Sequence, residues 1–219
     1  MAGTTVRDAG TVEHAFWEAL SAVGVNPEQH LPFLRSSMGW PKIEVFRAVL
    51  GDDARAHLAN ARFEDSYDGA VSRGDVEPLP GAETAFAALR AADVRICLAT
   101  GFSRATQEHI VDVLGWRDLV DLTLAPEPDD GVRGRPYPDL VLAALLRMRV
   151  DDVREVAVAG DTVSDLVAGT RAGASIVAGV LGGAHDATTL SRAPHTHLVA
   201  AIDELPTVIA GAYSSAGAM

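Results

Sequence analysis

Short apolar runs alternate with longer segments of helical spacing between residues 82 and 180, and this alternation constrains the fold more than any other feature. The runs predict buried strands, and apolar residues three or four positions apart predict helices. Parallel strands need crossover connections, so the alternation implies a parallel sheet covered by helices on both faces. We expect strands at Val94–Ala99, Val120–Ala125, Glu155–Ala159 and Ser175–Val180, and helices at Ala82–Ala91, Arg104–Leu114, Pro138–Leu146 and Ser164–Ala172.

The part of the chain before this alternation has a different pattern. From Val12 to about Gly74 apolar residues recur at helical spacing, and no convincing strand is present. Two prolines and a glycine in Glu77–Gly81 mark the change, so we expect a boundary there. The small, polar tail from Gly211 to Met219 predicts a frayed end.

Composition narrows the class of protein. The 219 residues are 48% hydrophobic, which predicts one globular domain, or one domain with an inserted lobe. A net charge of −12 with 18 basic residues argues against nucleic-acid or anionic-membrane partners, because such partners are held by Lys and Arg. No apolar run is long enough to span a bilayer and no secretory pattern is present, so we expect a cytoplasmic protein. The single cysteine, Cys97, lies in an apolar run typical of a buried side chain rather than a nucleophile.

Three polar residues stand at or beyond the ends of predicted strands. Thr100 follows the first strand, Arg135 lies on the loop after the second, and Asp161 follows the third. Ligands of such sheets bind beyond the carboxyl ends of the strands, so we expect these side chains to converge. Each alone has a plainer reading, since Thr100 could simply end a strand and Arg135 could be a surface cation.

The segment Gly160-Asp161-Thr162-Val163-Ser164-Asp165 follows a predicted strand and opens a predicted helix. Two carboxylates on such a loop suit Mg²⁺, which usually takes one or two carboxylates together with water and substrate phosphate. The same residues also suit a helix N-cap, in which Thr162 or Asp161 accepts backbone N–H bonds. The segment alone does not decide between the two.

Four segments resemble, in order, the four motifs of the haloacid dehalogenase superfamily, and the resemblance spans nearly the whole chain. They are Met1-Ala2-Gly3-Thr4-Thr5, Ala99-Thr100-Gly101-Phe102, Gly134-Arg135-Pro136-Tyr137-Pro138 and Gly160-Asp161-Thr162-Val163-Ser164-Asp165. The resemblance implies a Rossmann-like α/β core, residues 1–7 and 78–212, and a helical cap, residues 8–77, inserted after the first motif. It also implies a magnesium-dependent hydrolase in which an Asp of the first motif attacks phosphorus and water then hydrolyses the aspartyl phosphate.

The resemblance further implies roles for the motif residues. Thr100 would hydrogen-bond a phosphoryl oxygen, and Arg135 would hold phosphate charge and orient the nucleophile. Mg²⁺ would be bound by Asp161 and the backbone carbonyl of Ala2, with Asp165 in or just outside the metal shell. The expected substrate-binding residues are Gly3, Thr4 and Gly101.

One segment of the predicted cap indicates which branch of the superfamily the chain resembles. Ser37-Met38-Gly39-Trp40-Pro41-Lys42-Ile43-Glu44 is similar to the cap motif of phosphonoacetaldehyde hydrolase, in which a lysine forms an imine with the substrate aldehyde. Lys42 falls on that lysine and is the only lysine among 18 basic residues. In most members of the family an acidic residue stands at the position of Ala2 and protonates the leaving alkoxide. An imine accepts the electron pair of a broken carbon–phosphorus bond, so that chemistry needs no such acid. The plainer reading of Lys42 is a surface cation.

The chain departs from the family at its first motif. The nucleophilic Asp would stand just before Met1, and the central strand ahead of it is also missing. Loss of that strand would leave unpaired backbone groups and an opened core. We therefore expect a start codon assigned too late or a shortened chain, and no turnover through an aspartyl phosphate by the chain that begins at Met1. The competing hypothesis is a catalytically silent phosphate-binding or interaction protein.

Two further departures concern the substrate. Phosphonoacetaldehyde hydrolase has a histidine where this chain has Val45, and its early cap cysteine has no counterpart near Ala9–Val12. The chain is more similar to the phosphonatase-like hydrolases, which share the late stretches Gly183–Asp186 and Pro194–His197. The resemblance thus implies a small phosphonate or phosphate ester as substrate. The exact substrate stays open, as does the oligomeric state, for which a homodimer is one option.

Overall fold

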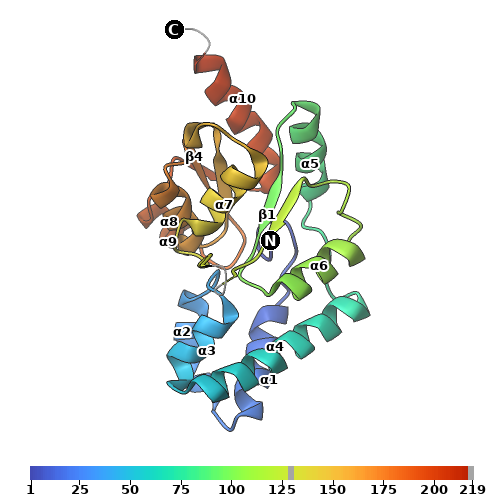
Figure 1. Cartoon of the computed structure of the whole chain (residues 1–219), viewed down its shortest axis with the longest axis vertical. Helices are drawn as coiled ribbons and strands as arrows, with labels where there is room; N and C mark the ends of the chain where they lie inside the picture. Colours follow the sequence, from blue (N-terminus) through green and yellow to red (C-terminus); the bar gives the residue numbers. More distant parts are fainter. Residues whose placement is uncertain (128–130, 217–219) are drawn as a thin grey trace.

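The structure, a computed structural model, describes residues 1–127 and 131–216. An all-helical part and an α/β part lie one below the other in Figure 1. The all-helical part contains α1 (Thr11–Ala22), η1 (Pro27–His30), α2 (Leu31–Ser36), α3 (Lys42–Leu50) and α4 (Asp53–Arg73). The helical pattern of the sequence therefore gave the correct class of structure for this region.

Two connections join the two parts, and they run side by side. Arg7 N donates to Glu77 O at 2.8 Å, and Leu79 N donates to Thr5 O at 2.8 Å. The chain thus leaves the α/β part and returns to it at nearly the same place. We propose the domain boundaries here, with a cap of residues 8–77 and a core of residues 1–7 and 78–212.

The α/β part follows the predicted order of elements. Its helices are α5 (Ala82–Ala91), α6 (Arg104–Val113), α7 (Asp139–Met148), α8 (Val163–Ala172), α9 (Ala187–Arg192) and α10 (Leu205–Ala216), with short turns η3 (Val153–Glu155) and η4 (Ile202–Glu204). Its strands are β1 (Cys97–Ala99), β2 (Leu122–Leu124), β3 (Ala157–Gly160), β4 (Ile176–Val180) and β5 (His197–Val199). Helix α10 includes residues 211–216 of the predicted tail, and residues 217–219 lie outside the described part.

The strands form two parallel sheets rather than the single sheet expected. β1 pairs with β2, and β3 pairs with β4, which pairs with β5. Within the described residues β1 and β3 each have a neighbour on one side only. Regular pairing needs a partner along the whole strand, so the strands predicted at Val94–Ala99 and Glu155–Ala159 are shorter or shifted, and Glu155 lies in the turn η3.

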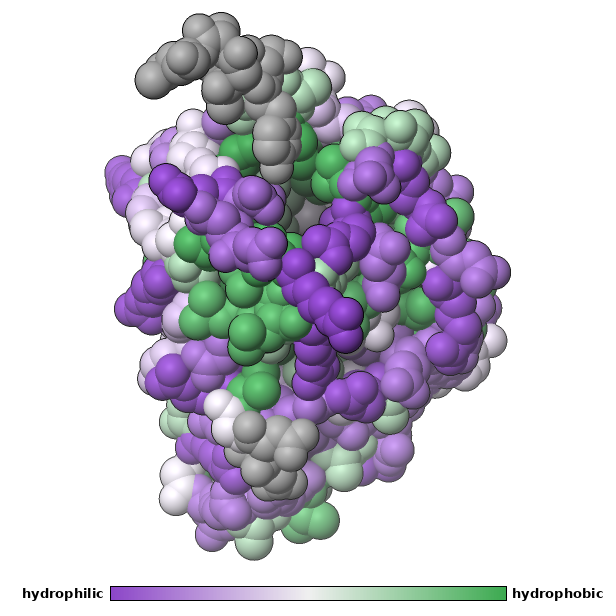
Figure 2. Space-filling view, turned by 45° about the horizontal axis from the view of Figure 1, so that its top comes forward, coloured by the Kyte–Doolittle hydropathy of each residue, from purple (hydrophilic) through white to green (hydrophobic). Residues whose placement is uncertain are grey.

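A cavity of about 580 Å³ separates the two sheets. β1 and β3 border it from the two sides, and apolar residues of α5, α7 and α10 cover it. Figure 2 shows apolar side chains gathered around a hollow in the face that is turned forward. The core is thus open between β1 and β3.

A cluster of aromatic rings joins the cap to the core. Phe16 of α1 lies 4.8 Å from Phe63 of α4 between ring centroids, and Tyr67 of α4 lies 4.5 Å from Phe102 of the core. All four side chains are buried, and burial of such rings stabilises both the cap and its contact with the core. No helix of the described residues is long and apolar enough to cross a membrane.

Candidate active site

The loops after β1 and β3, the first residues of the chain and the segment before α3 meet at one cavity of about 350 Å³. This convergence agrees with the expectation for the carboxyl ends of parallel strands. Thr4 does not line this cavity, but its hydroxyl hydrogen-bonds Asp161. The other predicted site residues line the cavity, namely Ala2, Gly3, Lys42, Thr100, Gly101, Arg135, Asp161 and Asp165.

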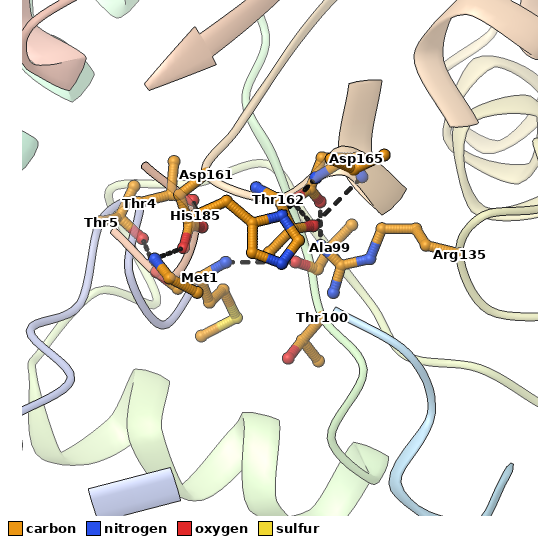
Figure 3. Close-up of polar contacts among 12 residues, drawn as sticks. Met1, Thr4, Thr5, Ala99, Thr100, Arg135, Asp161, Thr162, Asp165 and His185 are labelled. Carbon is orange, nitrogen blue, oxygen red and sulfur yellow. Dashed lines mark hydrogen bonds and ion pairs between the residues drawn. The ribbon is translucent and has the colours of Figure 1, made fainter. Parts of the chain in front are cut away.

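Asp161 follows β3 directly and is 3% exposed. Its Oδ1 accepts a hydrogen bond from Thr4 Oγ1 at 2.5 Å, and its Oδ2 accepts one from Ala184 N at 2.8 Å (Figure 3). Burial and the repulsion of Asp165 raise the pKa of Asp161 above its usual range. Gly3 permits this packing, because its φ is +80° and a Cβ there would lie 2.0 Å from Asp161 Oδ2.

Asp165 lies in the first turn of α8 and has both an electrostatic and a capping role. Thr162 Oγ1 and N both donate to Asp165 Oδ2, at 2.5 and 3.0 Å, and Thr162 Oγ1 accepts from Asp165 N. These bonds form a capping box. Burial works against the Asp165 carboxylate, but Arg135 and the Thr162 bond hold its pKa below the usual range. The two readings of the sequence segment are therefore compatible, since Thr162 and Asp165 cap the helix while Asp161 faces the cavity.

Arg135 extends from the loop before α7 and pairs with Asp165 through Nη1 (Figure 3). Its side chain is 12% exposed, which excludes the reading of a surface cation. Its Nε is buried and has no hydrogen-bond partner among residues 1–127 and 131–216. A buried donor without a partner costs free energy, whereas Nη1 of the same side chain is satisfied by Asp165.

Thr100 and Gly101 form the floor of the cavity beneath the cap. Thr100 is 2% exposed, and its Oγ1 accepts from Phe102 N at 3.2 Å. Gly101 O accepts from Lys42 N at 3.3 Å, and a Cβ at Gly101 would lie 2.5 Å from Trp40 O. Glycine therefore allows the cap to approach the core this closely.

Lys42 is the first residue of α3 and is 7% exposed, so it is not a surface lysine. Its Nζ lies 5.2, 5.7 and 5.3 Å from the ring centroids of Phe16, Phe63 and Phe102. In the described part of the chain the Nζ of Lys42 has neither a hydrogen bond nor an ion pair. Burial first, and then the positive charge of Arg135, lower its pKa from 10.5 to about 8. A substantial fraction is therefore neutral amine near physiological pH.

Sequence reasoning missed the surroundings of Lys42. The three aromatic rings belong to α1, α4 and the loop after β1, and nothing in their spacing connects them. Asp8 also lines the cavity, and its charge partly offsets the fall in the pKa of Lys42. The sequence gives one signal for Asp8, which is its position next to the connection between the two parts of the chain.

Metal-binding side chains are few. The described residues contain no group of three or more His, Cys, Asp or Glu side chains arranged to hold a metal ion. His195 and His197 form local hydrogen bonds to Ala193 O and Thr196 Oγ1. No cluster of side chains among the described residues would thus hold a metal by itself, and a cation at Asp161 would need oxygen ligands from backbone, water or substrate.

Comparison with known proteins identifies the family. The haloacid dehalogenase-like hydrolase family matches residues 2–173, which is most of the chain. The chain belongs to this family. It is therefore a hydrolase of the haloacid dehalogenase type, and the resemblance to that superfamily is confirmed.

Several curated relatives of this haloacid dehalogenase-like hydrolase cover much of its length. "Probable phosphatase IndB" of Dickeya dadantii is 26% identical over 93% of this chain and 88% of that protein. A phosphonoacetaldehyde hydrolase of Pseudomonas entomophila is 29% identical over 91% of this chain and 80% of that protein. One from Bacillus cereus (strain B4264) is 32% identical, but the match covers only 48% of this chain and 39% of that protein.

A solved structure shows the same fold. The phosphonoacetaldehyde hydrolase-like protein of Oleispira antarctica has a TM-score of 0.79 and 20% identity, and the match covers 96% of this chain and 89% of that one. Identity this low supports the fold alone. The expected Rossmann-like core with a helical cap is confirmed.

Proposed function

We propose that this hydrolase is a magnesium-dependent phosphonatase-like enzyme that cleaves a small phosphonate, or a phosphate ester, through an aspartyl phosphate. The observation that carries the proposal is the position of Lys42, whose buried amine lines the same cavity as Arg135 and Asp161. Hydrolysis of a phosphate ester needs no amine in this place. Cleavage of the carbon–phosphorus bond of an aldehyde phosphonate needs a group that accepts the released electron pair, and an imine is such a group.

The carboxylates of the cavity fit Mg²⁺. Asp161 and Asp165 repel each other in a buried place, and a bound cation would offset that repulsion. Asp161 and the carbonyl of Ala2 would hold the ion, with Asp165 in or just outside its shell. Magnesium, when bound, would neutralise negative charge on the phosphoryl group.

Lys42 would perform the chemistry at the aldehyde. Its neutral amine adds to the carbonyl carbon, one proton is taken up from solvent and water leaves, which gives a protonated imine. When the carbon–phosphorus bond breaks, the phosphoryl group passes to the attacking carboxylate and the bonding pair enters the imine to form an enamine. Protonation of the enamine carbon and hydrolysis of the resulting imine release the aldehyde and restore the amine. Because the imine accepts the electrons, Ala2 in place of an acid is no obstacle.

Arg135 and Thr100 would bind the phosphoryl group. Arg135 lines the cavity with its guanidinium-bearing side chain, and Thr100, at the end of β1, lines it with a hydroxyl-bearing one. Gly3 and Gly101 would let the substrate approach the backbone closely. Phosphoryl transfer depends mainly on positioning and charge stabilisation, which these groups supply.

The attacking carboxylate is proposed to stand directly ahead of Met1, on a strand between β1 and β3. The amino group of Met1 lies 3.5 Å from Ala99 O, at the carboxyl end of β1. From that point the cavity between the sheets extends back along β1, with strand edges on two sides and apolar helices above and below. Such surroundings suit a parallel strand that is apolar on both faces. Its last residue would lie beside Asp161.

Phosphate release from aldehyde phosphonates and phosphate esters in the presence of MgCl₂ tests the proposal. We expect release by a chain extended at Met1 with an apolar strand that ends in Asp. The chain that begins at Met1 should release none, and neither should the extended Asp161→Ala variant. If the extended chain binds phosphate without turnover, the protein is the silent phosphate-binding one. Robust turnover by the chain that begins at Met1 would refute the proposed nucleophile.

A further inference from the structure

We propose that His185 is a positioning residue, which holds the cap segment 37–42 against the core through a hydrogen bond from its Nε2 to Arg35 O. His185 lies in the loop between β4 and α9, and its imidazole is half-buried. The inference concerns the closure of the cap over the cavity. It does not depend on which reaction the cavity performs.

The contacts of the imidazole fix its tautomer. Val163 N, at the start of α8, donates to His185 Nδ1 at 3.0 Å. Nδ1 therefore carries no proton, and in the neutral ring the proton is on Nε2. Nε2 lies 3.2 Å from Arg35 O of α2, so this N–H donates to a carbonyl of the cap (Figure 3 shows the ring). One side chain of the core thus binds both the core and the cap.

Arg35 stands directly before the segment that enters the cavity. In that segment, Gly39 packs so closely on the core that a Cβ would lie 2.7 Å from Thr162 Oγ1. At its end, Lys42 N donates to Gly101 O at 3.3 Å. The His185 bond therefore holds one end of the segment, and the Lys42 bond holds the other.

The cap is also held at a second, separate place. His109 of α6 lies 3.6 Å from Asp68 of α4, and its Nε2 lies 3.5 Å from Ser72 Oγ. In Figure 1, α4 runs below α6, whereas α2 and α3 lie below α8 and α9 on the other side of the molecule. Contacts at α6 can thus persist while the α2 side opens, and His185 is placed to oppose that opening.

The loop of His185 also supports Asp161. Ala184 N donates to Asp161 Oδ2 at 2.8 Å, and His185 N donates to Asp161 O at 3.2 Å. The same short segment therefore touches the carboxylate of the cavity and the cap. This arrangement would keep the side chains of Lys42 and Asp161 at a fixed position relative to each other.

Two substitutions separate the proposed role from simple capping of α8. In His185→Asn the side-chain oxygen can replace Nδ1 as acceptor for Val163 N, but the shorter side chain does not reach Arg35. In His185→Gln the amide can reach Arg35 O, whereas the acceptor for Val163 N is lost. Each of the two variants thus removes one hydrogen bond of His185 and keeps the other.

Lys42 reports on cap closure, because it is the only lysine and gives a single ¹⁵Nζ signal. In His185→Asn we expect the pKa of Lys42 to rise from about 8 toward 10.5, since an open cap admits water to the amine. Amide hydrogen exchange in residues 38–42 should accelerate roughly two- to tenfold, as expected for the loss of one neutral hydrogen bond. His185→Gln should stay near wild type in both measurements.

The thermal midpoint and the exchange of α8 amides serve as controls. The proposal is supported if His185→Asn opens the segment while both controls stay at wild-type values. It is overturned if His185→Asn leaves Lys42 and residues 38–42 unchanged, or if both variants have the same effect. It is also overturned if His185→Asn loses its thermal transition, because His185 would then act on the whole fold. None of these measurements requires turnover, so their failure is distinct from failure of the proposed function.

Discussion

Replacement of Lys42 by methionine should stabilise the protein. Burial and Arg135 lower the pKa of Lys42 from 10.5 to about 8. Because one pKa unit corresponds to about 1.4 kcal/mol, the ammonium destabilises the folded state at neutral pH by about 3 kcal/mol. Methionine has similar length and no charge, and it can fill the space between Phe16, Phe63 and Phe102. Lys42→Met should therefore raise the free energy of unfolding at pH 7 by up to about 3 kcal/mol, or roughly 6–12 °C in thermal midpoint.

The pH dependence of this gain follows from the two pKa values of Lys42. Well below pH 8 the lysine is charged in both states, so the full cost is present. Between pH 8 and 10.5 the folded protein loses the proton first, so wild-type stability rises and most of the methionine advantage is gone at pH 10. Urea denaturation at pH 7 and pH 10 measures this, with Lys42→Arg as the variant that keeps the charge. Equal stability of wild type and Lys42→Met at pH 7, or an equal advantage at both pH values, would refute the reasoning.

Three further predictions concern the cavity. Asp161→Ala should lose the calorimetric signal of Mg²⁺ binding, and equal binding by that variant would rule out the assignment. Gly3→Ala should weaken Mg²⁺ binding and destabilise the fold by about 1–3 kcal/mol, because the new Cβ would lie 2.0 Å from Asp161 Oδ2; a stable variant with unchanged affinity contradicts this. Gly101→Ala places a Cβ 2.5 Å from Trp40 O and should lift the cap, so the pKa of Lys42 should rise; an unchanged ¹⁵Nζ titration would show that the cap stays closed.

The residues of the cavity were predictable because the chemistry follows strand ends. Thr100 and Asp161 directly follow β1 and β3, and the topology of a parallel sheet brings such positions together. Arg135 lies farther along the loop after β2, and both that position and its motif placed it at the cavity. Its pairing with Asp165 was not predicted, because a sequence does not show which of several nearby charges will be in contact.

The environment of Lys42 and the extent of the strands could not be predicted. The rings around the amine come from helices whose angle of packing decides whether they meet, and that angle is set by the whole cap. The strand predicted at Val94–Ala99 is regular only at Cys97–Ala99, since apolar character predicts burial but not a partner for each N–H and C=O. The late histidines likewise gave no sign that His185 would reach Arg35 of the cap.

The claim that Lys42 forms an imine can be tested most directly by reductive trapping. The imine forms before the carbon–phosphorus bond breaks, so the chain that begins at Met1 is sufficient for the experiment. After incubation with an aldehyde phosphonate and borohydride, peptide mass spectrometry should find the substrate attached to Lys42 in the wild type and no adduct in Lys42→Arg. Two results together would contradict the account. These are the absence of the adduct in the wild type, and hydrolysis of phosphate esters by the extended chain at a rate that Lys42→Arg does not change. The protein would then be a phosphatase.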